Sequence, residues 1–129
     1  MALGRDRVGG LPVRLGNSGL RVDEIKMNLP DLDKIIHERT RLRILASLAA
    51  QPLQKSSFLE LKEKLEMTAG NLSSQLSVLE STSYVSIEKG FHGRKPFTEI
   101  TLTLKGSKAF DNYLDALDSM IASLKPRKE

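Results

Sequence analysis

The sequence contains no cysteine, and this absence removes several classes of protein from consideration at once. Disulfide frameworks, thiolate metal sites and cysteine nucleophiles all require the missing side chain. No apolar run approaches the ~20 residues that a membrane-spanning helix needs. The N-terminus also lacks the continuous apolar stretch of a secretory signal. We therefore expect a cytoplasmic protein with no membrane association.

Patterns typical of catalysis or metal binding are missing as well. The two histidines, His37 and His92, lie far apart in the sequence, and without cysteine they form no recognisable ligand set. We find no Ser-His-Asp spacing, no phosphate-binding Gly-rich loop between a strand and a helix, and no convergent carboxylates. We expect a protein that is not an enzyme and that binds no metal or cofactor.

Net charge is less informative about the function of the protein. The formal charge is +4 and the isoelectric point is near 9.5. This balance allows an anionic partner such as nucleic acid without requiring one, so the positions of the cations matter more than their total.

Residues 1–29 differ in composition from the rest of the chain. They hold five of the nine glycines and four scattered arginines, and they show no sustained helical or alternating period. We expect a flexible basic arm. Alternatively, the domain starts at Met27 and the residues before it are not native. Both interpretations leave one folded domain, over residues 30–129.

Helical spacing of apolar residues begins after Pro30. Residues 32–49 carry an apolar stripe in which Thr40 is a break or an N-cap between two helices, and Pro52 stops the pattern. Ser57 and Glu60 have the S-x-x-E spacing of a capping box and predict a short helix. After a turn of about three residues, Thr68 caps a further helix over 68–80, which is helix-turn-helix spacing.

The helix over 68–80, "TAGNLSSQLSVLE", has an unusual outward face. Leu72, Leu76 and Leu79 define its buried side, so the opposite side is small and polar. Such a face lets the helix axis approach the major groove of DNA, which is ~12 Å wide and admits one helix. Hydroxyls and amides can contact phosphates and base edges there. The alternative is a face that is merely solvated.

The pattern changes from helical to alternating in "YVSIEKGFHGRKPFTEITLTL". This predicts a β-hairpin with a long, mobile tip of about seven residues. Four candidate cations lie on that tip: Lys89, His92, Arg94 and Lys95. They could follow the phosphate backbone or enter the minor groove, where arginine is favoured. An ordinary solubilising loop is the alternative.

A final helix is expected over 104–124, with Thr103 as its cap. Its apolar residues form a heptad-like seam: Phe110, Leu114, Leu117, Ile121 and Leu124. The seam either folds back on its own domain or pairs with the same helix of a second subunit, which would make a homodimer. A small-molecule effector cleft lined by Phe110, Tyr113 and Met120 is a further hypothesis, against which ordinary packing is the alternative.

Three segments resemble the winged-helix transcriptional regulators of the MarR/ArsR type, and particularly a compact prokaryotic subgroup: "RTRLRILASLAAQ", "FLELKEKLEMTAGNLSSQLSVLESTSYVSIEKG" and "ITLTLKGSKAF". The resemblance covers about residues 31–124. It implies a mainly α fold with a small β-hairpin, a winged helix-turn-helix whose recognition helix is 68–80 and whose wing is 89–96. The residues that it implies in DNA contact are Thr68, Asn71, Ser73, Ser74, Ser77, Arg94 and Lys95.

The chain departs from many such regulators because no Arg or Lys lies between Lys64 and Lys89. Arginine-to-guanine readout from the recognition helix is therefore excluded, and specificity is expected to be modest or to depend partly on DNA shape. The leading hypothesis is a dimeric regulator of transcription that binds double-stranded DNA. The alternative is a winged helix that serves as a protein–protein adaptor, since a fold does not fix a function.

Overall fold

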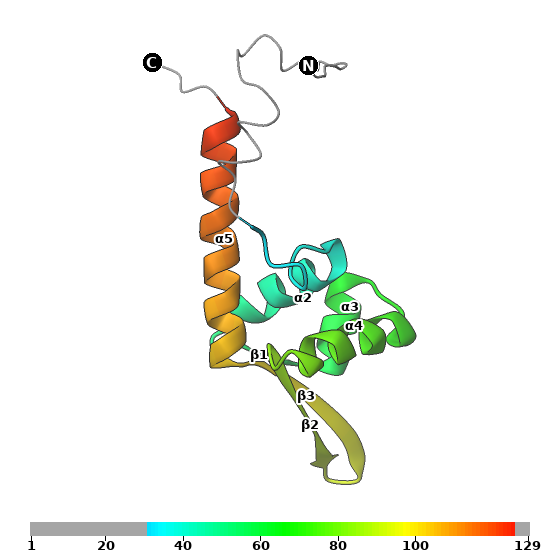
Figure 1. Cartoon of the computed structure of the whole chain (residues 1–129). Helices are drawn as coiled ribbons and strands as arrows, with labels where there is room; N and C mark the ends of the chain where they lie inside the picture. The colour runs from blue at the N-terminus through cyan, green and yellow to red at the C-terminus, as the bar shows by residue number, and fades with distance from the viewer. Residues whose placement is uncertain (1–30, 126–129) are drawn as a thin grey trace. The chain divides into compact units, whose positions relative to one another are not determined.

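The computed structural model describes residues 31–125 (Figure 1). Its elements follow the order α2 (Arg39–Ala49), β1 (Lys55–Ser57), α3 (Phe58–Leu65), α4 (Ala69–Ser81), β2 (Val85–His92), β3 (Lys95–Leu102) and α5 (Leu104–Leu124). The predicted fold class, mainly helical with a hairpin and a long C-terminal helix, is confirmed. The predicted arm at residues 1–29 lies outside the described residues.

Residues Leu32–Asp115 form one compact unit, and the remainder of α5, from Ala116, belongs to a second one. The first unit is built around aliphatic side chains that helices and sheet contribute together. Those with no measurable exposure are Ile36, Ile44, Leu45, Leu48, Leu61, Leu72, Leu79 and Ile100. Burial of such side chains contributes roughly 1.5–3 kcal/mol each, so this core fixes how the helices pack on the sheet.

The segment before α2 is not the helix that the apolar stripe indicated. Residues 34–36 form a turn, because the Oδ1 atom of Asp33 accepts hydrogen bonds from the backbone N–H groups of Ile35 (2.8 Å) and Ile36 (3.3 Å). Short acidic side chains offer the backbone this alternative to a helix. The N-cap of α2 is Glu38 rather than Thr40.

Glu38 caps α2 as a carboxylate. Its Oε1 atom accepts from the backbone N–H of Arg41 at 2.7 Å. Partial burial opposes the charged form, but the hydrogen bonds from the backbone of Arg41 and Thr40 outweigh it and lower the pKa of Glu38. The negative charge therefore stays at the positive end of the helix dipole.

Asp33 also anchors the junction between α4 and the sheet. Its Oδ2 atom accepts a hydrogen bond from the Tyr84 hydroxyl at 2.5 Å. That hydrogen bond, together with burial and the nearby carboxylate charge, raises the pKa of Tyr84 to about 12. Tyr84 therefore remains a neutral donor at physiological pH and ties the junction after α4 to the segment before α2.

The three strands form one antiparallel sheet in the order β1-β3-β2. The sequence pattern did not predict β1, which has three residues and pairs Lys55 with Thr101 and Ser57 with Glu99. Ser57 has a second role, because its hydroxyl accepts from the N–H of Glu60 while the Glu60 side chain accepts from the N–H of Ser57. The predicted capping box is confirmed, and it makes the sheet run directly into α3.

The predicted length of the hairpin tip, about seven residues, is wrong. Pairing between β2 and β3 continues to His92 and Lys95, so Gly93 and Arg94 alone form the turn. Gly93 has a φ of 64°, which glycine adopts without steric cost. A two-residue turn of this kind matches the twist of the flanking strands. The wing is therefore an extension of the sheet rather than a loop.

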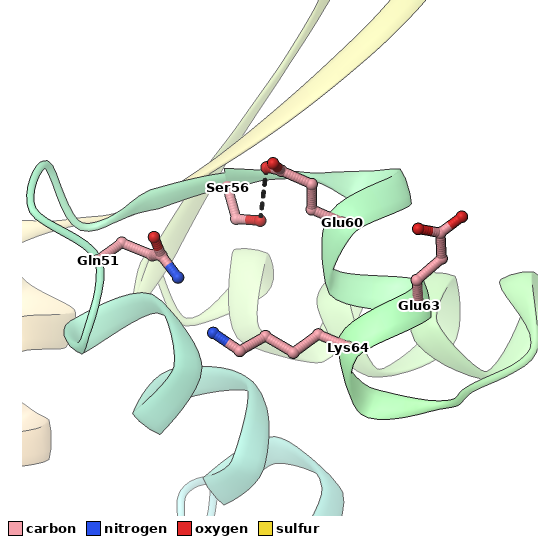
Figure 2. Close-up of a pocket in the computed structure, with 5 residues that line it drawn as sticks. All are labelled: Gln51, Ser56, Glu60, Glu63 and Lys64. Atoms are coloured by element: carbon pink, nitrogen blue, oxygen red, sulfur yellow. Dashed lines mark hydrogen bonds between the residues drawn. The ribbon is translucent and has the colours of Figure 1, made fainter.

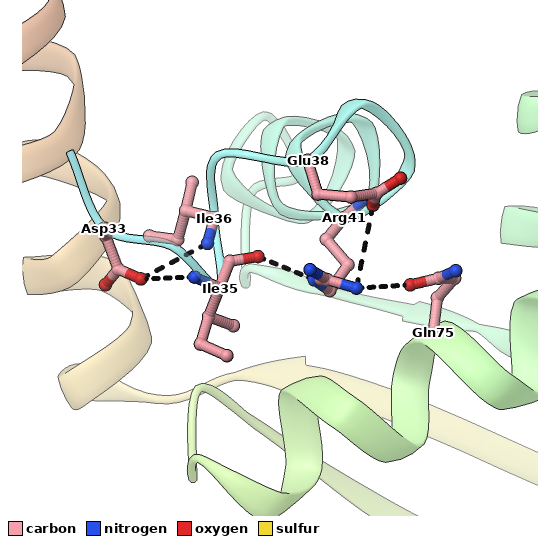
Figure 3. A network of polar contacts seen from close by, with 6 residues as sticks. All are labelled: Asp33, Ile35, Ile36, Glu38, Arg41 and Gln75. Carbon is pink, nitrogen blue, oxygen red and sulfur yellow. Dashed lines mark hydrogen bonds and ion pairs between the residues drawn. The ribbon is translucent and has the colours of Figure 1, made fainter.

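Two arginines of α2 hold the helix-turn-helix in place, and Figure 3 shows the contacts of the first, Arg41. Arg41 donates from Nε to the carbonyl of Ile35 (2.6 Å) and from its terminal nitrogen to Oε1 of Gln75 on α4 (2.8 Å). Arg43 donates to the carbonyl of Leu65 (3.2 Å) at the end of α3. Such charge-assisted bonds to a neutral acceptor contribute about 1.5–3 kcal/mol when partly buried. Nothing in the sequence distinguishes these arginines from solvated ones.

The first turn of α5 passes directly over the backbone of Tyr84. Thr103 caps the helix as predicted: its Oγ1 accepts from the N–H of Gly106 (2.9 Å) and donates to the carbonyl of Ser83 (2.6 Å). A β-carbon added at Gly106 would lie 2.1 Å from the Tyr84 carbonyl oxygen. Glycine is required there because of space, not because of its backbone angles.

We predict that Gly106→Ala lowers the free energy of unfolding by about 1–3 kcal/mol, because backbone must move to admit one methyl group. Gly70→Ala in α4 is the matched control, since an added β-carbon there meets nothing within 4 Å. It should be neutral or stabilising by up to about 1 kcal/mol. Urea denaturation followed by circular dichroism measures both; equal effects would contradict the close contact at Gly106.

We also predict that Arg41→Met lowers the free energy of unfolding by about 2 kcal/mol. Much of this loss should come from the hydrogen bond that Arg41 donates to Gln75. In a double-mutant cycle with Gln75→Leu, the two changes should be coupled by about 1 kcal/mol, because each removes the same hydrogen bond. The cycle is read by urea denaturation. Additivity within about 0.3 kcal/mol would show that α4 is held without this contact.

Candidate nucleic-acid interface

The rotation of α4 about its axis is set by three leucines. Leu72, Leu76 and Leu79 are 2% exposed or less, as the sequence predicted. All the proposed contact residues of this helix lie on exposed positions: Thr68, Asn71, Ser73, Ser74 and Ser77. Within residues 31–125, the side chains of Asn71, Ser73, Ser74 and Ser77 make no hydrogen bond. Their donors and acceptors are therefore available to an external partner.

The turn that presents α4 is tight and defined by its caps. α3 ends at Glu66, whose φ of 54° places it in the left-handed region, and the N–H of Met67 bonds to the carbonyl of Lys62 (3.0 Å). This pattern closes the helix C-terminus. One residue later Thr68 caps α4, with its Oγ1 accepting from the N–H of Asn71 at 3.1 Å, so the predicted cap is confirmed.

The wing carries its cations on a paired support. Lys89, His92, Arg94 and Lys95 are all exposed, and the far end of the hairpin projects beyond α3 and α4 (Figure 1). The His92 ring stacks on Phe97, with centroids 4.1 Å apart and an interplanar angle of 15°. Cross-strand aromatic pairs stabilise a hairpin, so the cationic side chains extend from strands whose pairing this stack supports.

At the base of the wing, one carboxylate already has a partner. Glu99 lies 3.7 Å from Nζ of Lys55 on β1 and faces Glu88 across the hairpin. The ion pair is partly exposed and contributes little stability. Its consequence is electrostatic, because it offsets a negative charge on the strand that leads to the wing tip.

The apolar residues of α5 divide into two groups. Phe110 and Tyr113 are buried in the first unit, and the Tyr113 hydroxyl lies 2.8 Å from Nδ1 of His37. Leu114, Ile121 and Leu124 are 43–44% exposed, and Leu117 is half-buried. From Asp115 to Leu124 no residue is buried. The proposed effector residues Phe110 and Tyr113 thus belong to the packed body.

A shallow polar recess lies beside α3 (Figure 2). Gln51, Ser56, Glu60, Glu63 and Lys64 line it. The carboxylate of Glu60 is engaged by the capping box and accepts from the Ser56 hydroxyl at 3.4 Å. All five lining residues are polar or charged, and none of them is a histidine.

Within residues 31–125, no group of three or more histidine or acidic side chains is placed to hold a metal ion. Within the same range, no helix has both the length and the apolar character needed to cross a bilayer.

Comparison with known proteins agrees with this geometry. Over residues 40–121 the chain matches the family model described as a winged helix DNA-binding domain. An uncharacterized protein of Methanocaldococcus jannaschii is 40% identical over 81 residues, which is 63% of this chain and 86% of that protein.

Solved structures show the same fold. A transcriptional regulator homologue from Pyrococcus horikoshii is 27% identical, with a TM-score of 0.66, over 81% of this chain and 97% of that chain. A MarR family transcriptional regulator from Streptomyces coelicolor, solved in complex with DNA, is 20% identical with a TM-score of 0.55, over 87% and 77% of the two chains. The helix-turn-helix, the wing and the family match lead to one conclusion: the chain belongs to the winged-helix DNA-binding domain family.

Proposed function

We propose that the protein acts as a dimer, inserts α4 into the major groove of double-stranded DNA and sets the β2–β3 wing against the backbone or the adjacent minor groove. The observation that carries this proposal is the exposed, chargeless face of α4 beside a cationic hairpin. A face that only met solvent would gain nothing from excluding charge. A face that enters a groove between two phosphate strands must exclude carboxylates.

The side chains of α4 suit close approach. Serine hydroxyls at positions 73, 74 and 77 are short and both donate and accept, which serves phosphates as well as base edges. Asn71 adds an amide, the group that pairs two-handed with adenine in the major groove. Because α4 has no arginine, it cannot make the arginine–guanine pair, which is the commonest specific contact to DNA bases. Sequence preference then rests on few direct contacts and on DNA shape.

The wing supplies charge that α4 lacks. Lys89, Arg94 and Lys95 present positive charges on the exposed part of the hairpin, whose far end projects beyond α3 and α4 (Figure 1). Neutralising phosphates releases condensed counterions, so such contacts give affinity that falls steeply with salt. The wing is thus the electrostatic part of the proposed interface.

We predict that Arg94→Glu with Lys95→Glu lowers DNA affinity at least about 100-fold and reduces the slope of log affinity against log salt by about 2, because two phosphate contacts are lost. Fluorescence anisotropy with a duplex obtained by random-library selection measures both quantities. Lys105→Glu with Lys108→Glu, at the opposite end of the hairpin in α5, makes the same charge change and should affect affinity far less. Unchanged affinity in the wing variant would reject the wing assignment.

The dimer rests on the second half of α5. Leu114, Ile121 and Leu124 recur at seven- and three-residue steps along one side of the helix and stay 43–44% exposed in the single chain. A heptad-like apolar seam of this kind is stable when a second helix covers it. Two copies related by a twofold axis would present two copies of α4 about one duplex turn apart, ~34 Å, to a palindromic site.

We predict that Leu114→Glu with Ile121→Glu converts a dimer into a monomer, because four buried carboxylates would face one another in the seam. Ser119→Glu, on the opposite side of α5, should leave the dimer intact. Sedimentation equilibrium reads the mass of each variant. A wild-type chain that sediments as a monomer at tens of micromolar would remove the dimer from the proposal and leave the α4 and wing contacts to the anisotropy test.

A further inference from the structure

One large apolar side chain of the wing has no role in the fold. Phe91 lies two residues before Gly93 on β2, and 70% of it is exposed. Aromatic side chains contribute most when they bury their surface, so a phenylalanine held in solvent leaves apolar area unused. The residues around Phe91 indicate which kind of partner would cover its ring.

Strand alternation places Phe91 on a particular face of the hairpin. Along β2, Val85, Ile87, Lys89 and Phe91 point to one side, and Val85 is the residue buried in the core. Phe91 therefore projects from the same face as the buried Val85, but at the exposed end of the strand.

The aromatic stack within the hairpin does not include Phe91. This stacked pair, His92 with Phe97, lies on the opposite face. Across the strands, Phe91 faces Pro96. Phe91 stays 70% exposed despite this neighbour.

The charge around Phe91 favours a nucleic acid over a protein surface as its partner. The ten residues from Lys89 to Thr98 include Lys89, Arg94 and Lys95 and no carboxylate. An apolar ring set among fixed cations is the arrangement of minor-groove proteins that insert a wedge between base pairs while their cations hold the backbone.

We propose that Phe91 inserts its ring into the minor groove beside the wing and partly unstacks one base-pair step, so that the bound duplex bends there. This inference rests on the proposed DNA-binding function and adds a wedge to it. Pyrimidine–purine steps such as TA and CA unstack most easily, so the position under the wing should be enriched in them. The wing then reads deformability, a source of specificity that needs no base-edge hydrogen bond.

The test uses the full chain and a duplex recovered from random-library selection with the wild-type protein. Fluorescence energy transfer between dyes at the duplex ends reports the bend, and 2-aminopurine at the step under the wing reports unstacking. Phe91→Ala should abolish the bend, suppress the 2-aminopurine signal and weaken binding about tenfold. Phe91→Leu should retain part of the bend, because an aliphatic side chain also acts as a wedge.

Leu53→Ala is the matched control, because Leu53 is 71% exposed but lies before β1, at the end of the sheet away from the wing turn. It should bend DNA as the wild type does. If Phe91→Ala still bends the duplex fully, the wedge is overturned while DNA binding stands. The wedge is likewise overturned if that variant changes only the association state of the protein. A selection that recovers no duplex overturns the proposed function and the wedge with it.

Discussion

The burial of three leucines fixes the rotation of α4, and the rest of the interface depends on that rotation. Leu72, Leu76 and Leu79 are 2% exposed or less, so the helix cannot turn without moving apolar area into water. Leucine-sized cavities cost about 2–5 kcal/mol each, which is a large part of a domain's net stability. The polar face of α4 therefore points outward because of leucines on the opposite side of the helix, and its own residues take no part in that packing. Arg41 adds a directional constraint at Gln75, on the flank of the same helix.

The wing depends on a different kind of constraint, which is strand register. Pairing from Val85 with Leu102 to His92 with Lys95 determines which side chains share a face. A slip of one residue would exchange the two faces along the whole hairpin, since strand side chains alternate. Val85 would then leave the core, so the buried base of the hairpin specifies what its exposed end presents. This coupling is why the face on which each wing cation lies is determined by packing at a distance from it.

The sequence predicts the elements that periodicity defines and does not reveal those that depend on distant or single contacts. The caps at Ser57 and Thr68 and the buried side of α4 follow from local chemistry, and all three predictions are confirmed. Three residues give no period, so β1 is not predictable; it forms only because β3 offers a free edge. The sequence indicated a loop at the hairpin tip because glycine and proline usually interrupt strands. Instead Gly93 makes the turn, and Pro96 lies beyond the part of β3 that pairs with β1, where no neighbouring strand needs its N–H.

The distribution of charge separates two tasks that many DNA-binding helices combine. α4 contains no charged residue before Glu80, whereas the wing concentrates cations. Attraction to phosphates acts over about a Debye length and does not depend on sequence, so a cationic wing can hold the protein near any duplex. In the proposed complex, base contacts from α4 act only at hydrogen-bonding distance and add no long-range attraction of their own. Affinity for non-matching DNA would then depend mainly on the cations of the wing, whereas discrimination between duplexes would depend on how well α4 fits its groove and on the proposed Phe91 wedge. Changes to the wing cations would therefore alter the search for a site more than its recognition, because charge and base contacts are carried by different elements of one packed core.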